Sequence, residues 1–399
     1  MKTDEANDGD KVLPGFVILF AVPGPVGQGD ISEIREETKP LPEEQARERL
    51  KALEEVELRL FGEEFHKAER TSRIVIGRME LAATEYSDLQ PTHADVYLVL
   101  HKTGAAILEA WMEAPKQEYN ADLWIKWLRS DSMEGITGSI RKGLRFLSGA
   151  YDPYCFITIV TANENIESFL RSHGADIVRL MYLDVSPMPF KDDFVSDELE
   201  RDFCLRKGGA SYMSISLAVH IKEIEGGSVA NELLQDVRAR SAIPFFLTVE
   251  LLLLEREVLR DYYDLLAINA FGSVSDLVGL KENILNGLEE YYGVIARANQ
   301  FSAPLREYGE KMLGINDIYE SVVDRLDAIT FDITMLYQRS NNVLTFLLTV
   351  LLSALEAGFI ASSIALYYIN DLFGVMFWTI LAAVVTAVAL SMVLYKRIR

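Results

Sequence analysis

Two apolar runs close the chain: VLTFLLTVLLSALEAGFIASSIALYYI at residues 343–369 and LFGVMFWTILAAVVTAVALSMVLY at residues 372–395, with Asn370-Asp371 between them. A helix needs about 20 residues to cross the ~30 Å hydrocarbon core of a bilayer, and each run has that length. Glu356 is the only charged residue in the two runs. The sequence therefore predicts an integral membrane protein with two transmembrane helices, joined by a short external loop at residues 370–371.

The charged residues beside these runs predict their orientation. Arg339 precedes the first run, and a basic tail at residues 396–399 follows the second one. Because positive charge is enriched on the cytoplasmic side of membrane proteins, both termini are expected in the cytoplasm and the loop outside. The predicted location is the plasma membrane, crossed twice.

The remainder of the chain is strongly acidic. The 399 residues carry a formal net charge of -21, and Glu356 and Asp371 are the only acids from Val343 onward. A negative surface argues against nucleic acid and anionic lipid as partners of the cytoplasmic part, and it fits a domain that attracts cations. A merely solvated acidic surface explains the charge equally well.

The cysteines and histidines predict no chemistry at a soluble site. Cys155 and Cys204 are isolated thiols without zinc-site or disulfide spacing, as expected in a reducing cytosol. The five histidines lie far apart and form no metal-ligand motif. We therefore expect neither an enzyme nor a covalently bound cofactor.

Residues 1–240 mix strand-like and helix-like patterns, which predicts a cytoplasmic α/β domain. Runs of β-branched and aromatic residues indicate strands, whereas apolar residues at three- and four-residue spacing indicate helices. The expected strands are residues 16–22, 74–81, 95–101, 105–113, 155–161, 177–185 and 211–221. The expected helices are residues 42–61, 120–147 and 166–173.

From residue 241 onward the pattern is helical throughout. A helical segment is expected at residues 241–304, followed by a stalk helix at 305–342 that continues into the first transmembrane helix at 343–369. Without an internal proline, residues 305–367 are expected to form one helix of roughly 90 Å at 1.5 Å per residue. Its apolar seam must pack on helices of the same subunit or of neighbouring ones. The seam consists of Leu305, Tyr308, Met312, Ile315, Tyr319, Val322, Leu326, Ile329, Ile333 and Leu336.

Polar residues in and beside the first span follow one line along the predicted helix, which we call the polar stripe. It consists of Gln338, Asn342, Thr345, Thr349, Ser353, Glu356, Ser363, Tyr367 and Asn370. At about 100° per residue, the stripe lies roughly opposite the continuation of the apolar seam. Hydroxyl groups also join membrane helices to one another, so helix packing and a water-filled path both explain the stripe.

Glu356 favours the water-filled path. An acid near the middle of a span is costly, and neither run offers a Lys or Arg to pair with it. It must be protonated, hydrogen-bonded to a neighbour or in contact with water. We therefore predict a cation-attracting pore lined by Asn342, Thr345, Thr349, Ser353, Glu356, Ser363 and Tyr367.

Two helices cannot enclose a pore, so a conducting form requires a symmetric ring of subunits. Asn370 and Asp371 would then surround the pore entrance, where amide dipoles and carboxylates attract cations. The same pair also suits a tight turn between two helices, which needs no pore.

This layout resembles that of the CorA family of divalent-cation channels. The family has Tyr-Gly-Met-Asn at the end of its first span, and this chain has Tyr367-Tyr368-Ile369-Asn370. The tyrosine and asparagine match, whereas the glycine and methionine are replaced. The resemblance implies a homopentamer that conducts Mg²⁺ or a similar divalent cation, is gated by its cytoplasmic domain, and binds the hydrated ion at Asn370. Divalent cations would be substrate or regulator.

Two alternatives stay open on the sequence alone. Divergent CorA-like proteins also occur as membrane effectors in antiviral defence of the CRISPR type, gated by a small anionic or nucleotide messenger. A non-conducting, membrane-anchored scaffold is the other alternative, because helix packing alone explains the hydroxyl groups of the stripe.

Overall fold

The computed structural model spans residues 1–399. The residues that it describes are 12–22, 26–61, 71–82, 90–101, 104–113, 119–129, 135–162, 165–186, 188–204, 206–224, 231–268, 278–279, 281–282, 284, 303–368 and 371–398.

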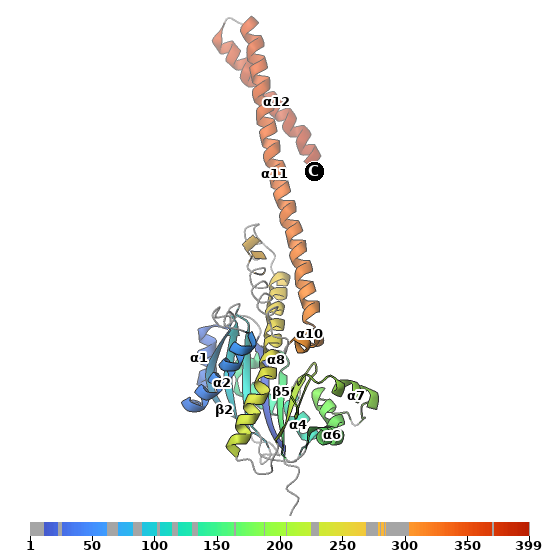
Figure 1. The fold of residues 1–399 in the computed structure, drawn as a ribbon. Coiled ribbons are helices and arrows are strands. Elements are labelled where there is room, and N and C mark those ends of the chain that lie inside the picture. The colour runs from blue at the N-terminus through green and yellow to red at the C-terminus, as the bar shows by residue number, and fades with distance from the viewer. Residues whose placement is uncertain are drawn as a thin grey trace, which may run out of the picture. The chain divides into compact units, whose positions relative to one another are not determined.

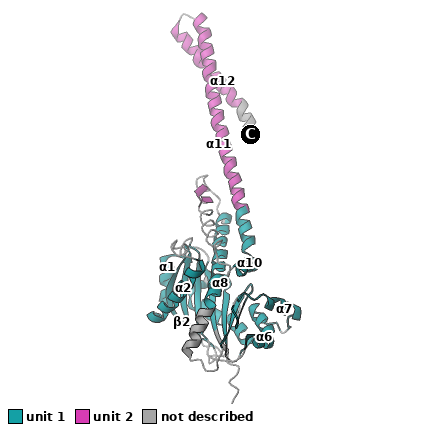
Figure 2. Ribbon diagram, in the orientation of Figure 1, with its two compact units in different colours: residues 1–269, 283–323 teal, residues 270–282, 324–399 magenta. Residues whose placement is uncertain are grey.

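The chain divides into two compact units, drawn in different colours in Figure 2. Unit 1 comprises Met1–Asn269 and Asn283–Val323, and unit 2 comprises Ala270–Glu282 and Asp324–Arg399.

The described strands of unit 1 form one seven-stranded sheet in the order β2-β3-β4-β1-β5-β7-β6. Neighbouring strands are antiparallel, except for the parallel pair β5 and β7. The strands are β1 (Val12–Val22), β2 (Thr71–Glu80), β3 (His93–His101), β4 (Ala106–Glu113), β5 (Tyr154–Ala162), β6 (Gly209–Met213) and β7 (Leu217–Ile224).

The register gives the two faces of this sheet different chemistry. Ile18 pairs with Ala110 and Phe20 with Leu108, so these apolar side chains share one face. Glu109, between Leu108 and Ala110 in β4, must then point to the opposite face. One face is therefore wholly apolar at the centre of the sheet, whereas the other carries a charge.

Short helices cover the apolar face and form the main core. They are α1 (Gln28–Glu36), α4 (Ala121–Leu128), α5 (Ile136–Gly143), the 3-10 helix η1 (Arg145–Gly149) and α6 (Ile166–Met181). Trp124 and Trp127 of α4 are buried and meet the Phe16 ring edge-on at 5.6 and 6.2 Å. Asn120 starts α4, because its side chain accepts a hydrogen bond from the Leu123 amide.

The charged face is covered by α2 (Glu43–Phe61) and the long helix α8 (Asn231–Ile268), which runs across the sheet in Figure 1. Phe246 of α8 packs between Trp111 and Phe156 of the sheet, at centroid distances of 4.8 and 5.2 Å. Helix α8 begins at Asn231 and ends at Ile268, so a single helix runs through residue 241. The change to helical pattern near residue 241 marks no boundary between the two units.

Several of the expected elements have the wrong type or extent. Residues 177–181 belong to α6, which includes the expected helix at 166–173 and continues to Met181; the strand predicted at 177–185 is wrong. Its apolar residues follow helical rather than alternating spacing, with Phe169, Ile177 and Met181 buried on one side. The helix predicted at 120–147 is three shorter elements, α4, α5 and η1.

The strand predicted at 211–221 is a hairpin. β6 and β7 pair antiparallel, and the chain turns between Met213 and Leu217. The Ser214 side chain accepts hydrogen bonds from the Ser216 and Leu217 amides, at 3.3 and 3.2 Å. A serine that binds the backbone in this way favours a turn over a continuous strand.

The single helix predicted at 305–367 is interrupted. α10 (Ala303–Met312) ends before α11 (Ile315–Tyr368), and Gly314 between them has a φ of +66°. This conformation is readily adopted by glycine and commonly ends helices. The apolar seam is nevertheless buried at Leu305, Ile315, Val322 and other positions, up to Ile333.

Unit 2 contains the two long apolar runs near the end of the chain. Two described helices, α11 and α12 (Leu372–Ile398), are long and apolar enough to cross a membrane. Their apolar side chains are largely exposed in the single chain, for example Phe359 at 71% and Phe373 at 83%. Exposed apolar surfaces of this extent are typical of sites that contact a membrane or another protein surface.

Candidate functional sites

The described members of the polar stripe all lie on α11. Ser353 is half-buried, whereas Asn342, Thr345, Thr349, Glu356, Ser363 and Tyr367 are exposed. The Thr349 hydroxyl donates to the Thr345 carbonyl at 2.8 Å, and that of Ser363 to the Phe359 carbonyl at 2.9 Å. These hydroxyl protons are satisfied within the helix, so the oxygens remain as acceptors for water or a cation.

Helix α12 contacts a different face of α11. Gly358 is buried there, and a Cβ added to it would lie 3.5 Å from the Thr379 carbonyl and 3.6 Å from the Ala383 Cβ. Ala365 is buried on the same side of the helix. At about 100° per residue, this small-residue face lies away from Thr349 and Glu356. Packing between α11 and α12 therefore leaves the polar stripe uncovered.

The turn between the two helices is made in part by Asp371. Its carboxylate accepts hydrogen bonds from the Phe373 and Gly374 amides, at 3.3 and 3.2 Å. This is an N-cap of α12, and a carboxylate is also favoured there by the helix dipole. Asn370 lies outside the described residues, as do the side chains of the basic tail. The observed geometry gives Asp371 a structural role that requires no pore.

A second group of charges, which the sequence did not predict, lies in unit 1 between the sheet and α8. Arg73 of β2 donates to Glu109 of β4 at 2.9 Å and to Glu250 of α8 at 2.5 Å. The indole N–H of Trp111 donates to the second oxygen of Glu109 at 2.6 Å. All three charged side chains are at least nine-tenths buried. Arg73 thus joins α8 to the sheet through the carboxylates of Glu250 and Glu109.

The two carboxylates differ in their protonation. Burial would raise the pKa of Glu109, but the Arg73 charge and three hydrogen bonds lower it below the usual value. Burial raises the pKa of Glu250 well above its ordinary range, and the negative charges of Glu109 and Glu57 raise it further. The ionised form is therefore favoured at Glu109, beside Arg73, and the neutral form at Glu250.

A neighbouring ionic network fixes α2 to the edge of the sheet. Asp95 of β3 is buried and accepts from Arg78 at 2.8 Å, and from Arg49 and Gln45 at 3.1 Å. Gln45 also accepts from Arg78 at 2.9 Å. The buried Asp95 carboxylate therefore accepts three hydrogen bonds, and we assign this network a structural role.

These sites provide no evident place for a metal. Within the described residues, no group of three or more His, Cys, Asp or Glu side chains could hold a metal ion. Comparison with known proteins adds no constraint, because no family model, curated protein or solved structure matches the chain.

Proposed function

We propose that this protein is a subunit of a homo-oligomeric cation channel in the plasma membrane, with the polar stripe lining its conduction path. The observation that carries the proposal is the uncovered stripe: α12 packs on the small-residue face of α11 at Gly358 and leaves Glu356 exposed. An unshielded acid in an apolar span is best accommodated in a water-filled cavity.

The enclosure of the path requires several copies of α11. A closed ring would repeat Thr349, Ser353 and Glu356 around one axis, and the resemblance to CorA channels implies five copies. The same resemblance implies Mg²⁺ or a similar divalent cation as substrate, Asn370 at the entrance, and gating by the acidic unit 1. Both termini then lie in the cytoplasm, with α12 toward the lipid.

The proposal is tested by reconstituting the purified protein in liposomes and by weighing it in detergent. We expect cation flux above that of protein-free liposomes, and a native mass equal to a whole-number multiple of the subunit mass, five for the implied ring. Protein-free liposomes with the same detergent history are the control. A monomer with full flux would exclude the ring, and an assembled oligomer without flux of any tested cation would favour the scaffold.

A further inference from the structure

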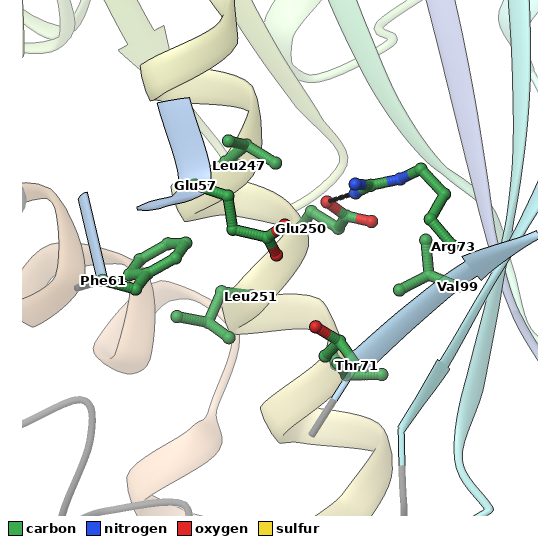
Figure 3. Close-up of a pocket in the computed structure, with 9 residues that line it drawn as sticks. Glu57, Phe61, Thr71, Arg73, Val99, Leu247, Glu250 and Leu251 are labelled. Atoms are coloured by element: carbon green, nitrogen blue, oxygen red, sulfur yellow. Dashed lines mark hydrogen bonds and ion pairs between the residues drawn. The ribbon is translucent and has the colours of Figure 1, made fainter. Parts of the chain in front are cut away.

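A small cavity lies beside Glu250, wholly within unit 1 (Figure 3). Its volume is about 40 Å³, which gives room for roughly two or three water-sized groups. Its polar lining residues are Glu57 of α2, Thr71 and Arg73 of β2, and Glu250 of α8. The apolar lining residues are Phe61, Val99, Leu247, Leu251 and Leu254.

Glu250 leaves one oxygen available to this cavity. Its Oε2 accepts from Arg73 and its carboxyl group also hydrogen-bonds Glu109, whereas its Oε1 is buried and accepts from no donor among the described residues. The Glu57 carboxylate points toward Glu250 in Figure 3, from the opposite helix. Arg73 is shared with Glu109, so its charge is already balanced on the sheet side. A buried oxygen without a partner is costly and favours a donor in the cavity.

We propose that the cavity binds the ammonium end of a small primary amine. The three N–H donors of an ammonium group match the Glu250 Oε1, the Glu57 carboxylate and the Thr71 hydroxyl, and the lining leucines of α8 accept a short alkyl stem. A metal ion fits less well, because no described cluster supplies three metal-ligating side chains.

Amine binding is coupled to release of one proton. In the empty site the neutral form of Glu250 is favoured, because burial and the charges of Glu109 and Glu57 raise its pKa. When the ammonium binds, the Glu250 O–H bond breaks, its proton goes to solvent, and the carboxylate pairs with the new cation. Binding must therefore strengthen as pH rises toward the folded pKa of Glu250, while the amine stays protonated up to about pH 10.

The charged groups that face Glu250 determine in which direction its pKa shifts, and therefore how binding and stability change with pH. Arg73 of β2 favours the ionised acid, whereas Glu109 of β4 and Glu57 of α2 oppose it. The α8 residues that line the cavity beside Glu250 are leucines. Without an amine, the fold loses stability as pH rises from the ordinary carboxyl pKa to the raised pKa of Glu250, because the unfolded chain loses that proton at lower pH. A bound cation removes this penalty.

The test uses the full-length protein in detergent, with methylammonium chloride as the probe and tetramethylammonium chloride at equal ionic strength as the control. We expect methylammonium to raise Tm, more at pH 8.5 than at pH 6, and tetramethylammonium, which has no N–H donor, to leave it unchanged. Equal shifts with the two salts, or a shift that does not grow with pH, would overturn the proposal and assign the cavity to water.

Variants locate the effect. Glu250→Gln should abolish the methylammonium shift, and it should fold because a neutral amide replaces a neutral acid. Glu57→Gln should weaken binding about tenfold through loss of one charged hydrogen bond, whereas Glu55→Gln, an exposed position on the same helix, should change nothing. A full shift in Glu250→Gln would place the bound amine elsewhere and overturn the assignment. Neither result depends on ion conduction.

Discussion

Replacing Arg73 with methionine is expected to lower the unfolding free energy of the protein by about 3–5 kcal/mol. The change leaves Glu109, whose side chain is 0% exposed, without the charge that lowers its pKa. Trp111 still donates one neutral hydrogen bond, which does not balance a buried carboxylate. Glu250 loses its anchor at the same time, so the contact between α8 and the sheet is weakened directly.

Denaturant unfolding of the full-length protein in detergent, followed by tryptophan fluorescence, measures this loss. Arg47→Met is the matched control, because Arg47 and its partner Glu43 are 78% and 88% exposed and the pair should contribute under about 1 kcal/mol. The double variant Arg73→Met with Glu109→Gln should recover part of the stability, since it removes the buried charge as well. A loss under about 1 kcal/mol for Arg73→Met alone would show that Glu109 reaches water.

Replacing Glu356 with glutamine is expected to remove most of the pH dependence of cation flux while leaving the oligomer intact. In a ring, several Glu356 carboxylates near the bilayer centre would repel one another if all were ionised, so they must share protons or hold a cation between them. Glutamine keeps the size and hydrogen-bonding capacity of the side chain without its charge.

The measurement compares flux in liposomes over a range of pH for the parent and the variant. Glu320→Gln is the control, because Glu320 is an exposed acid on α11 before the apolar run. If Glu356→Gln keeps the pH profile and cation preference of the parent, Glu356 is a structural hydrogen-bonding group, and the conduction path is not at the stripe.

The strands that could be predicted are those with a strong local signal. The predicted strand at 16–22 corresponds to the end of β1, and the predictions at 95–101 and 155–161 lie within β3 and β5, because these runs are apolar and rich in β-branched residues. The wrong strand at 177–185 has similar composition, but it follows a capped helix start at Asn165. The apolar residues that follow Asn165 keep helical spacing up to Met181, and this spacing, rather than the β-branched composition, predicts the observed helix.

The polar stripe could be predicted from the sequence, whereas the buried group of Arg73, Glu109 and Glu250 could not. The stripe follows from periodicity within one helix, whereas its exposure depends on which face of α11 meets α12. Arg73 lies 36 residues from Glu109 and 177 residues from Glu250, so no local pattern joins them. The only local signal was Glu250 itself, an acid inside the apolar run from Phe245 to Leu254. The assignment of pore-lining residues stays a prediction.

The most direct test of the central claim is thiol blocking of cation flux at two positions. Thr349→Cys places a thiol on the polar stripe, and Val385→Cys places one on the exposed surface of α12, where the native side chain is 58% exposed. The background carries Cys204→Ser; Cys155 can remain, because burial raises the pKa of its thiol to about 12 and keeps it unreactive. A charged methanethiosulfonate reagent should block flux through Thr349→Cys and spare Val385→Cys. Block at Val385→Cys alone, or at neither position in a conducting protein, would contradict the account.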